Sequence, residues 1–176
     1  MTTEYEVKIL EINIDEVIDK LNKLGADKVS EKMQRRYIYD FNPKKDNSWI
    51  RLRTDGEKTT LTVKEIQNDR IDGTRELEII VDDFEKTNLL MEKLGYFVKS
   101  YQENKRTRYI LDNIEIDIDS WPQIPPYLEI EAGSAAEVES MAERIGFNPS
   151  RITSMNTIDV YKKYGIDLDS IKELKF

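Results

Sequence analysis

Alternating charged and apolar side chains open the chain, from residue 4 to residue 9. Successive side chains of a β-strand face opposite ways, so Glu4, Glu6 and Lys8 share one face and their apolar neighbours share the other. The same alternation returns at Glu76–Ile79 and at Glu129–Glu131. The pattern predicts three amphipathic strands, each with a charged face.

A helix is expected after each of these strands, because apolar residues recur at helical spacing and a capping residue precedes each run. The expected helices span residues 14–24, 84–94 and a segment that begins after Ser134. Glycine follows each of them, at Gly25, Gly95 and Gly146, where a helix C-terminus commonly needs a left-handed residue. A basic strand follows the first two helices, so the chain is an imperfect internal repeat.

Further strands carry basic residues or complete hairpins. They are expected at residues 33–41, 49–53, 60–64, 101–111 and 114–119. The turn signals Asp55-Gly56 and Asp112-Asn113 predict hairpins between neighbouring strands of this set. Arg51 and Arg53 share one strand face, and so do the arginines of the later hairpin.

Two segments depart from the sheet pattern. Pro122, Pro125 and Pro126 predict a loop, because proline cannot donate a hydrogen bond to a strand ladder. Residues 151–176 carry apolar and aromatic side chains at three-residue steps and are expected to form a C-terminal helical tail packed on the body.

Composition limits the chemistry that the chain can perform. The 176 residues are expected to form one domain, and the formal net charge of −8 argues against a nucleic-acid-binding surface. No apolar run approaches the ~20 residues of a membrane span and no signal-peptide core opens the chain, so a cytoplasmic protein is expected. Cysteine and histidine are absent, which excludes thiolate nucleophiles, imidazole bases and the usual zinc ligands. A metal site would use carboxylate oxygens, which prefer hard cations.

The charged strand faces carry both signs. The acidic members are Glu4, Glu6, Glu76, Glu78, Asp117, Asp119, Glu129 and Glu131, and the basic members are Lys8, Arg36, Arg51, Arg53, Lys64, Arg106 and Arg108. A solvated sheet face would explain any single strand. The complete set favours a site, because Glu-x-Glu recurs three times with its carboxylates only ~6.6 Å apart. If the strands close with these faces inward, the charges require partners, a metal or a charged ligand, and a metal-bound triphosphate fits.

The order of these motifs resembles the CYTH superfamily, the triphosphate tunnel metalloenzymes. The resemblance covers residues 2 to 165 and rests on Glu-x-Glu-x-Lys from Glu4, Arg51-x-Arg53, Lys64, Glu76-x-Glu78, a basic strand, Asp119 and Glu129-x-Glu131. It implies an α+β fold in which a closed eight-stranded antiparallel β-barrel forms a tunnel, with the helices packed outside. Residues 1–176 would then be a single CYTH-like domain, of which residues 151–176 are the tail.

The resemblance also implies roles for residues. The implied ligands of Mg²⁺ or Mn²⁺ are Glu4, Glu6, Glu76, Glu78, Asp119, Glu129 and Glu131. The implied phosphate-binding residues are Lys8, Arg36, Arg51, Arg53, Lys64, Arg106 and Arg108, and the implied catalytic residues are Glu4, Glu6 and Lys8. The usual Lys-x-Arg of the basic strand aligns here with either Asn104-x-Arg106 or Arg106-x-Arg108. Arg36 exceeds the family pattern, and Trp121–Pro126 replaces a glycine-containing turn.

Three functions are open on this resemblance. The preferred one is divalent-metal-dependent hydrolysis of inorganic triphosphate or of an organic or nucleoside triphosphate. A class IV adenylyl cyclase, which converts ATP to cyclic AMP and pyrophosphate, is the alternative. A non-catalytic polyphosphate-binding module is a third, but uncompensated carboxylates would repel its ligand. The expected partner is a small-molecule triphosphate, with no nucleic acid and no membrane, for a monomer or homodimer. The tail is expected to be a packed helix, with a lid over one tunnel end as the alternative.

Overall fold

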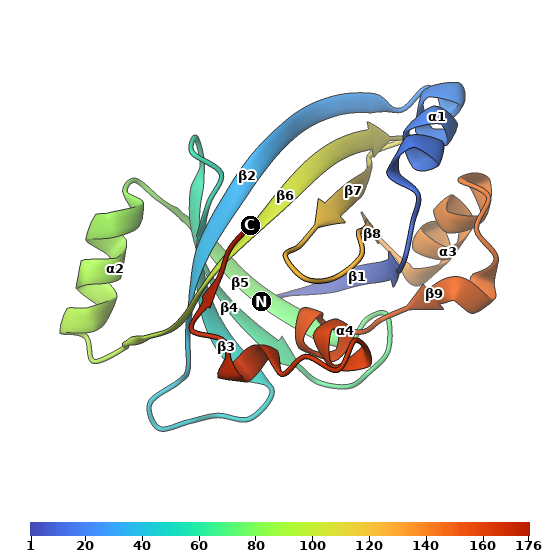
Figure 1. Cartoon of the computed structure of the whole chain (residues 1–176). Coiled ribbons are helices and arrows are strands. Elements are labelled where there is room, and N and C mark those ends of the chain that lie inside the picture. The colour runs from blue at the N-terminus through green and yellow to red at the C-terminus, as the bar shows by residue number, and fades with distance from the viewer.

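Eight strands of the chain close into a barrel in the computed structural model, which describes residues 1–176 (Figure 1). They are β1 (Thr2–Ile9), β2 (Asp27–Tyr39), β3 (Ser48–Thr54), β4 (Thr59–Ile66), β5 (Thr74–Val81), β6 (Val98–Leu111), β7 (Ile114–Ser120) and β8 (Tyr127–Ala132). Neighbours around the wall run β6-β2-β3-β4-β5-β1-β8-β7, and β7 pairs back with β6. All these pairings are antiparallel. The expected closed eight-stranded barrel is confirmed.

Three helices begin where the sequence places a capping residue. They are α1 (Ile14–Leu24), α2 (Phe84–Lys93) and α3 (Ala135–Arg144). The side chains of Asn13, Asp83 and Ser134 each accept a hydrogen bond from a backbone N–H in the first turn. Gly25 then ends α1 with a φ of 78°, in the left-handed region that favours glycine.

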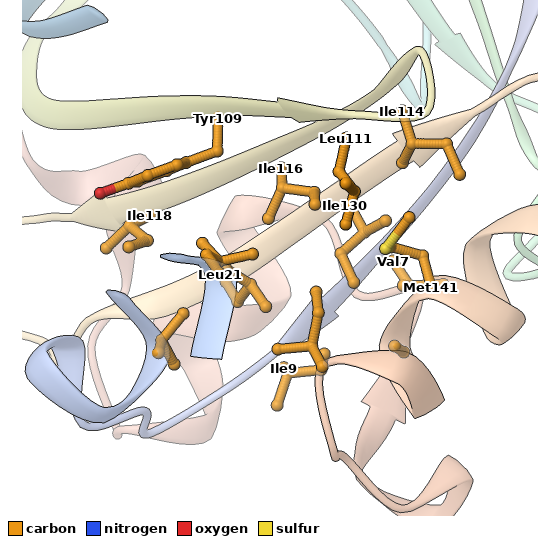
Figure 2. Close-up of a cluster of buried hydrophobic side chains, with 14 of the residues drawn as sticks. Val7, Ile9, Leu21, Tyr109, Leu111, Ile114, Ile116, Ile118, Ile130 and Met141 are labelled. Carbon is orange, nitrogen blue, oxygen red and sulfur yellow. The ribbon is translucent and has the colours of Figure 1, made fainter. Parts of the chain in front are cut away.

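The largest apolar cluster lies outside the barrel, between the strands and two helices. It holds 16 buried residues from α1, α3 and the outward faces of β1, β6, β7 and β8. Figure 2 shows Ile116 and Ile130 of neighbouring strands close to Leu21 of α1. Because strand side chains alternate, packing Val7 and Ile9 outward turns Glu6 and Lys8 into the barrel.

The opposite side of the barrel carries a smaller cover. Figure 1 shows α2 on the far side of the barrel from α1 and α3. Its cluster contains five buried residues: Tyr39, Ile50, Leu52, Phe84 and Met91. α2 does not cover the outward face of β5, where Leu77 and Ile79 are 52% and 53% exposed. The barrel is therefore covered thickly on one side and thinly on the other.

The C-terminal segment packs against the barrel and ends as an added strand. It contains the 3₁₀ turn η1 (Pro149–Arg151), β9 (Ile152–Thr153), α4 (Thr157–Lys163), the 3₁₀ turn η2 (Leu168–Ser170) and β10 (Glu173–Leu174). β9 pairs with β1, and β10 pairs in parallel with β6 at Tyr101 and Gln102. α4, η2 and β10 share a third apolar cluster with Trp121 and Tyr127.

Two strands are longer than the sequence pattern predicts. β2 starts at Asp27 and ends at Tyr39, where residues 33–41 were expected, and β6 starts at Val98. The additional residues of β2 pair with β6, from Asp27 opposite Ile110 onward. This part of β2 is mostly exposed and lacks apolar alternation, so its pairing with β6 makes it a strand.

Candidate functional site

The barrel encloses a cavity of about 1040 Å³ whose wall is mostly charged or polar. Of the residues expected in the site, the following line it: Glu4, Glu6, Lys8, Arg36, Arg51, Arg53, Lys64, Glu76, Glu78, Arg106, Arg108, Glu129 and Glu131. Asp119 does not line it and lies fully buried behind Arg106 and Asn104. Strand parity thus brings nearly the whole expected set into one space.

Lys8 joins the two Glu-x-Glu strands that meet in the wall. β1 and β8 pair with Glu6 opposite Glu131 and Lys8 opposite Glu129. The ammonium group of Lys8 contacts Glu6 and lies 3.3 Å from a carboxylate oxygen of Glu129. Burial lowers the pKa of Lys8, but these two carboxylates outweigh it and raise the pKa above its ordinary value.

Lys64 plays the corresponding role between β1 and β5. Its ammonium group lies 2.9 Å from Glu4 and 2.7 Å from Glu76. Burial, together with the neighbouring carboxylates, raises the pKa of Glu4 to about 8. Burial also acts to raise the pKa of Glu76, but Lys64 and the hydrogen bond with Glu4 bring it down to about 2. The two carboxylates therefore carry close to one negative charge between them near pH 7.

Arg106 of β6 pairs with three carboxylates of β7 and β8. Its guanidinium nitrogens lie 2.5 Å from Asp119, 2.7 Å from Asp117 and 2.8 Å from Glu129. Arg108 binds Asp117 through two hydrogen bonds, of 2.8 and 2.6 Å. Both arginines of the basic strand therefore face the interior, and both are paired with carboxylates.

The arginines of β2 and β3 are different, because their charge is poorly matched. Arg51 comes no closer than 3.6 Å to a carboxylate oxygen, and Arg53 no closer than 3.8 Å. Arg36 hydrogen-bonds only to the side-chain oxygens of Gln34 and Asn104. Repulsion from Arg51, with burial, lowers the pKa of Arg53. Burial, with repulsion from Arg53 and Arg51, lowers the pKa of Arg36 well below its ordinary value. This side of the cavity holds surplus positive charge.

Two contributors received no site role from the sequence, although Asp117 was among the charged strand residues. Asp117 is 4% exposed and is the shared partner of Arg106 and Arg108. Trp121, placed in the loop by its prolines, lines the cavity. Asp117 shares the strand face of Asp119, two residues away on β7, whereas Trp121 lies just beyond the end of β7, where strand alternation no longer predicts the direction of a side chain.

The carboxylates suit a hard divalent cation in their chemistry. Glutamates of β1, β5 and β8 supply only oxygen donors, as Mg²⁺ and Mn²⁺ prefer. Burial and repulsion from Glu6 and Glu129 raise the pKa of Glu131 to about 7, a crowding that a cation would relieve. No three carboxylates converge closely enough to hold an ion as the chain stands. Most of these carboxylates are turned toward lysine or arginine instead. The donor atoms therefore suit a hard divalent cation, but the side chains would have to rotate to bind one.

Comparison with known proteins supports the same reading. A family model described as the CYTH domain matches residues 2–157. A Methanocaldococcus jannaschii protein, named "Putative adenylate cyclase MJ0240", is 27% identical over 132 residues, which cover 73% of this chain and 75% of that protein.

Solved structures share the fold over nearly the whole chain. PH1012 from Pyrococcus horikoshii aligns with a TM-score of 0.76 at 24% identity, covering 89% of this chain and 98% of its own. The Hippeastrum protein HpAC1, described as having a dominant triphosphatase activity, aligns with a TM-score of 0.63 at 15% identity, covering 97% and 100%. At these identities the likeness concerns the fold. No helix of this chain is long and apolar enough to cross a bilayer.

Proposed function

Because the chain belongs to the CYTH domain family, we propose that it is a divalent-metal-dependent triphosphatase that works inside its charged barrel. The observation that supports this most directly is the division of charge in the cavity. Arg36 forms no ion pair, and the nearest carboxylate oxygens of Arg51 and Arg53 are 3.6 and 3.8 Å away, while glutamates of β1 and β8 crowd together elsewhere in the wall. A polyanion bridged to carboxylates by a metal satisfies both sides.

Arginine and lysine side chains hold the substrate in this proposal. Arg51 and Arg53 share one face of β3, and each offers a forked set of donors to phosphate oxygens. Lys64 lies on the adjacent strand, with Thr62 opposite Arg51 in register. Lys8, Arg106 and Arg108 pair with carboxylates in the free protein, and they would be released to bind phosphate oxygens if a metal took those carboxylates.

Glutamates supply the metal ligands. Glu4 and Glu6 of β1 and Glu129 and Glu131 of β8 lead this set, and the members at its margin are Glu76, Glu78 and Asp119. When bound, Mg²⁺ or Mn²⁺ offsets phosphate charge and supplies activated water for hydrolysis. In the free protein Lys8 lies between Glu6 and Glu129 and orients both carboxylates, and together with Arg106 it holds the pKa of Glu129 below its ordinary value.

Product analysis tests the proposal. Purified protein is incubated with Mg²⁺ or Mn²⁺ and inorganic triphosphate, and the products are separated by chromatography. One water consumed per bond should give equal amounts of orthophosphate and pyrophosphate, and chelation of the metal should stop the reaction. The same assay is repeated with ATP. If the protein binds inorganic triphosphate and ATP but hydrolyses neither with Mg²⁺ or Mn²⁺, it is not a triphosphatase for these two substrates.

Adenylyl cyclase activity is the second candidate, favoured by the name of the M. jannaschii relative and by the size of the cavity. About 1040 Å³ lies near the upper end of the ~300–1,000 Å³ typical of small-molecule pockets, so it can admit a nucleoside as well as a triphosphate chain. With ATP, a cyclase releases cyclic AMP and pyrophosphate in equal amounts. ADP and orthophosphate as the products would favour hydrolysis instead.

A further inference from the structure

Two buried nitrogen donors of the cavity lie together without acceptors. Arg36 of β2 is 6% exposed and Trp121, in the loop between β7 and β8, is 4% exposed. The guanidinium carbon of Arg36 lies 4.5 Å from the centroid of the Trp121 ring. Nε of Arg36 and Nε1 of Trp121 are both buried and have no hydrogen-bond partner. Buried donors of this kind destabilise a protein unless a ligand satisfies them.

The charge of Arg36 is also unmatched. Its two hydrogen bonds go to the neutral amide oxygens of Gln34 and Asn104, and it forms no salt bridge. Of the nearby charges, Arg51, Arg53 and Arg106 repel it and Asp119 attracts it. A buried cation without a counter-charge is costly, so this arrangement is suited to receive an anion.

The arrangement is held in place from behind. Tyr161 of α4 meets the Trp121 ring edge-on, with the centroids 6.3 Å apart and the planes at 81°. The hydroxyl of Tyr161 donates a 2.8 Å hydrogen bond to the carbonyl oxygen of Pro122. The C-terminal segment therefore fixes both the indole and the loop that carries it, and the donors are ordered before any ligand arrives.

We propose that Trp121 is a further phosphate-binding residue of the cavity, whose indole N–H donates a hydrogen bond to a phosphate group beside the guanidinium of Arg36; we call this pair the Arg36–Trp121 subsite. The subsite rests on the proposed function, since a phosphate group of the triphosphate is its ligand. The indole ring also screens one face of the guanidinium and aligns it by cation–π contact. Trp121 is thus both a platform and a donor.

Binding of inorganic triphosphate, measured by calorimetry first without metal and then with Ca²⁺ to neutralise the carboxylates, tests the subsite apart from turnover. Arg36→Met keeps an unbranched chain on the ring but removes the charge, and should weaken binding roughly 10- to 100-fold. Arg36→Lys keeps the charge and should retain part of the affinity. Trp121→Phe keeps an aromatic platform but removes the N–H, and should weaken binding by about 3- to 10-fold.

Arg35 provides a matched control on the same strand. It stacks on Phe84 at 4.8 Å, outside the barrel, so Arg35→Met removes an arginine–aromatic pair that is not in the cavity. It should bind triphosphate like the wild type. Arg36→Met should not lower the melting temperature of the free protein, because it removes an unmatched buried charge, whereas a purely structural arginine would.

The outcomes separate the two proposals. Wild-type affinity in both Arg36→Met and Trp121→Phe would overturn the subsite, even in a protein that hydrolyses triphosphate. Suppose that the wild type binds triphosphate and that the variants bind it more weakly, as expected, but that no substrate is hydrolysed with metal. The subsite then stands and the proposed activity fails. Equal weakening by Arg35→Met and Arg36→Met would also overturn the subsite, since it would show a general loss of positive charge.

Discussion

The two sides of the barrel differ both in the apolar packing on their outer faces and in the ion pairing on their inner faces. β1, β6, β7 and β8, which we call the paired wall, carry the 16-residue cluster outside and ion pairs of 2.5 to 3.3 Å inside. β2 to β5, the open wall, carry a five-residue cluster outside. The arginines of β2 and β3 have carboxylates no closer than 3.6 Å or none. Lys64 on β4 is the exception, because its ammonium group lies 2.7 Å from Glu76 on β5 and 2.9 Å from Glu4 on β1. Stability is concentrated in one wall and unsatisfied charge in the other.

This difference indicates how the fold tolerates a polyanion site. A barrel lined with unmatched arginines would be unstable if every strand carried them, because buried charges of one sign repel. Here the basic residues of the paired wall that line the cavity are all in ion pairs and two helices cover its outer face, so it can support the opposing strands. The following variants test this division of labour.

The largest effect is expected from Glu6→Ala, on the paired wall. Glu6 contacts Lys8 and faces Glu131, and its loss removes a proposed metal ligand. Metal-dependent turnover should fall at least about 100-fold. Initial rates against Mg²⁺ concentration measure this, and full activity would remove Glu6 from the metal site.

Arg106→Gln should mainly destabilise the protein. It leaves Asp119, which is fully buried, and Glu129 without their shared cation. Breaking a buried ion pair from one side costs about 3–5 kcal/mol of unfolding free energy. Urea denaturation followed by circular dichroism measures it. An unchanged midpoint would show that the short ion pairs of the paired wall do not stabilise it.

Ile130→Ala and Leu77→Ala compare the outer faces of the two walls. Ile130 is fully buried in the larger cluster, so its truncation should cost about 2–5 kcal/mol. Leu77 on β5 is 52% exposed, and its truncation should cost about 0.5 kcal/mol or less. Equal losses in the same denaturation experiment would mean that the outer face of β5 is covered in solution.

Arg53→Gln should lower triphosphate affinity with little effect on stability, the opposite of Arg106→Gln. Its closest carboxylate oxygen is 3.8 Å away, so little pairing is lost, while one fork of phosphate donors disappears. Triphosphate affinity should fall roughly 10- to 100-fold with the unfolding free energy almost unchanged. Arg75→Gln, at an exposed position on β5, is the control and should bind triphosphate normally. Loss of stability without loss of affinity would reverse the roles assigned to the two walls.

Alternation and helical spacing predicted much of the fold. α1 occupies the expected residues 14–24, and Glu4, Glu6 and Lys8 share one strand face as expected, which the structure turns toward the cavity. Closure did not follow, because the pairing of β1 with β8 joins distant parts of the chain and periodicity does not specify partners. The family resemblance supplied that step, and the structure confirms it.

The charged set of the site followed from the sequence, but the partners of each charge did not. Arg36, Arg51 and Arg106 read alike in the sequence, yet Arg106 holds three carboxylates and Arg36 none. That distinction depends on cross-strand register, which sets Arg106 opposite Asp119 and Arg36 opposite Gln102. Trp121 received no role in the site, because it was expected in a loop, where strand alternation does not predict the direction of a side chain.

The pairing of β1 with both β5 and β8 also constrains how the protein comes to be made. β1 is synthesised before the other barrel strands, so it must wait for β8 before its second edge is occupied. Long-range strand pairing of this kind is slow and leaves edges open to aggregation meanwhile. Glu6 and Glu131 meet only in that final pairing. A nascent chain therefore brings together the proposed metal ligands of β1 and β8 at the same moment as the wall closes.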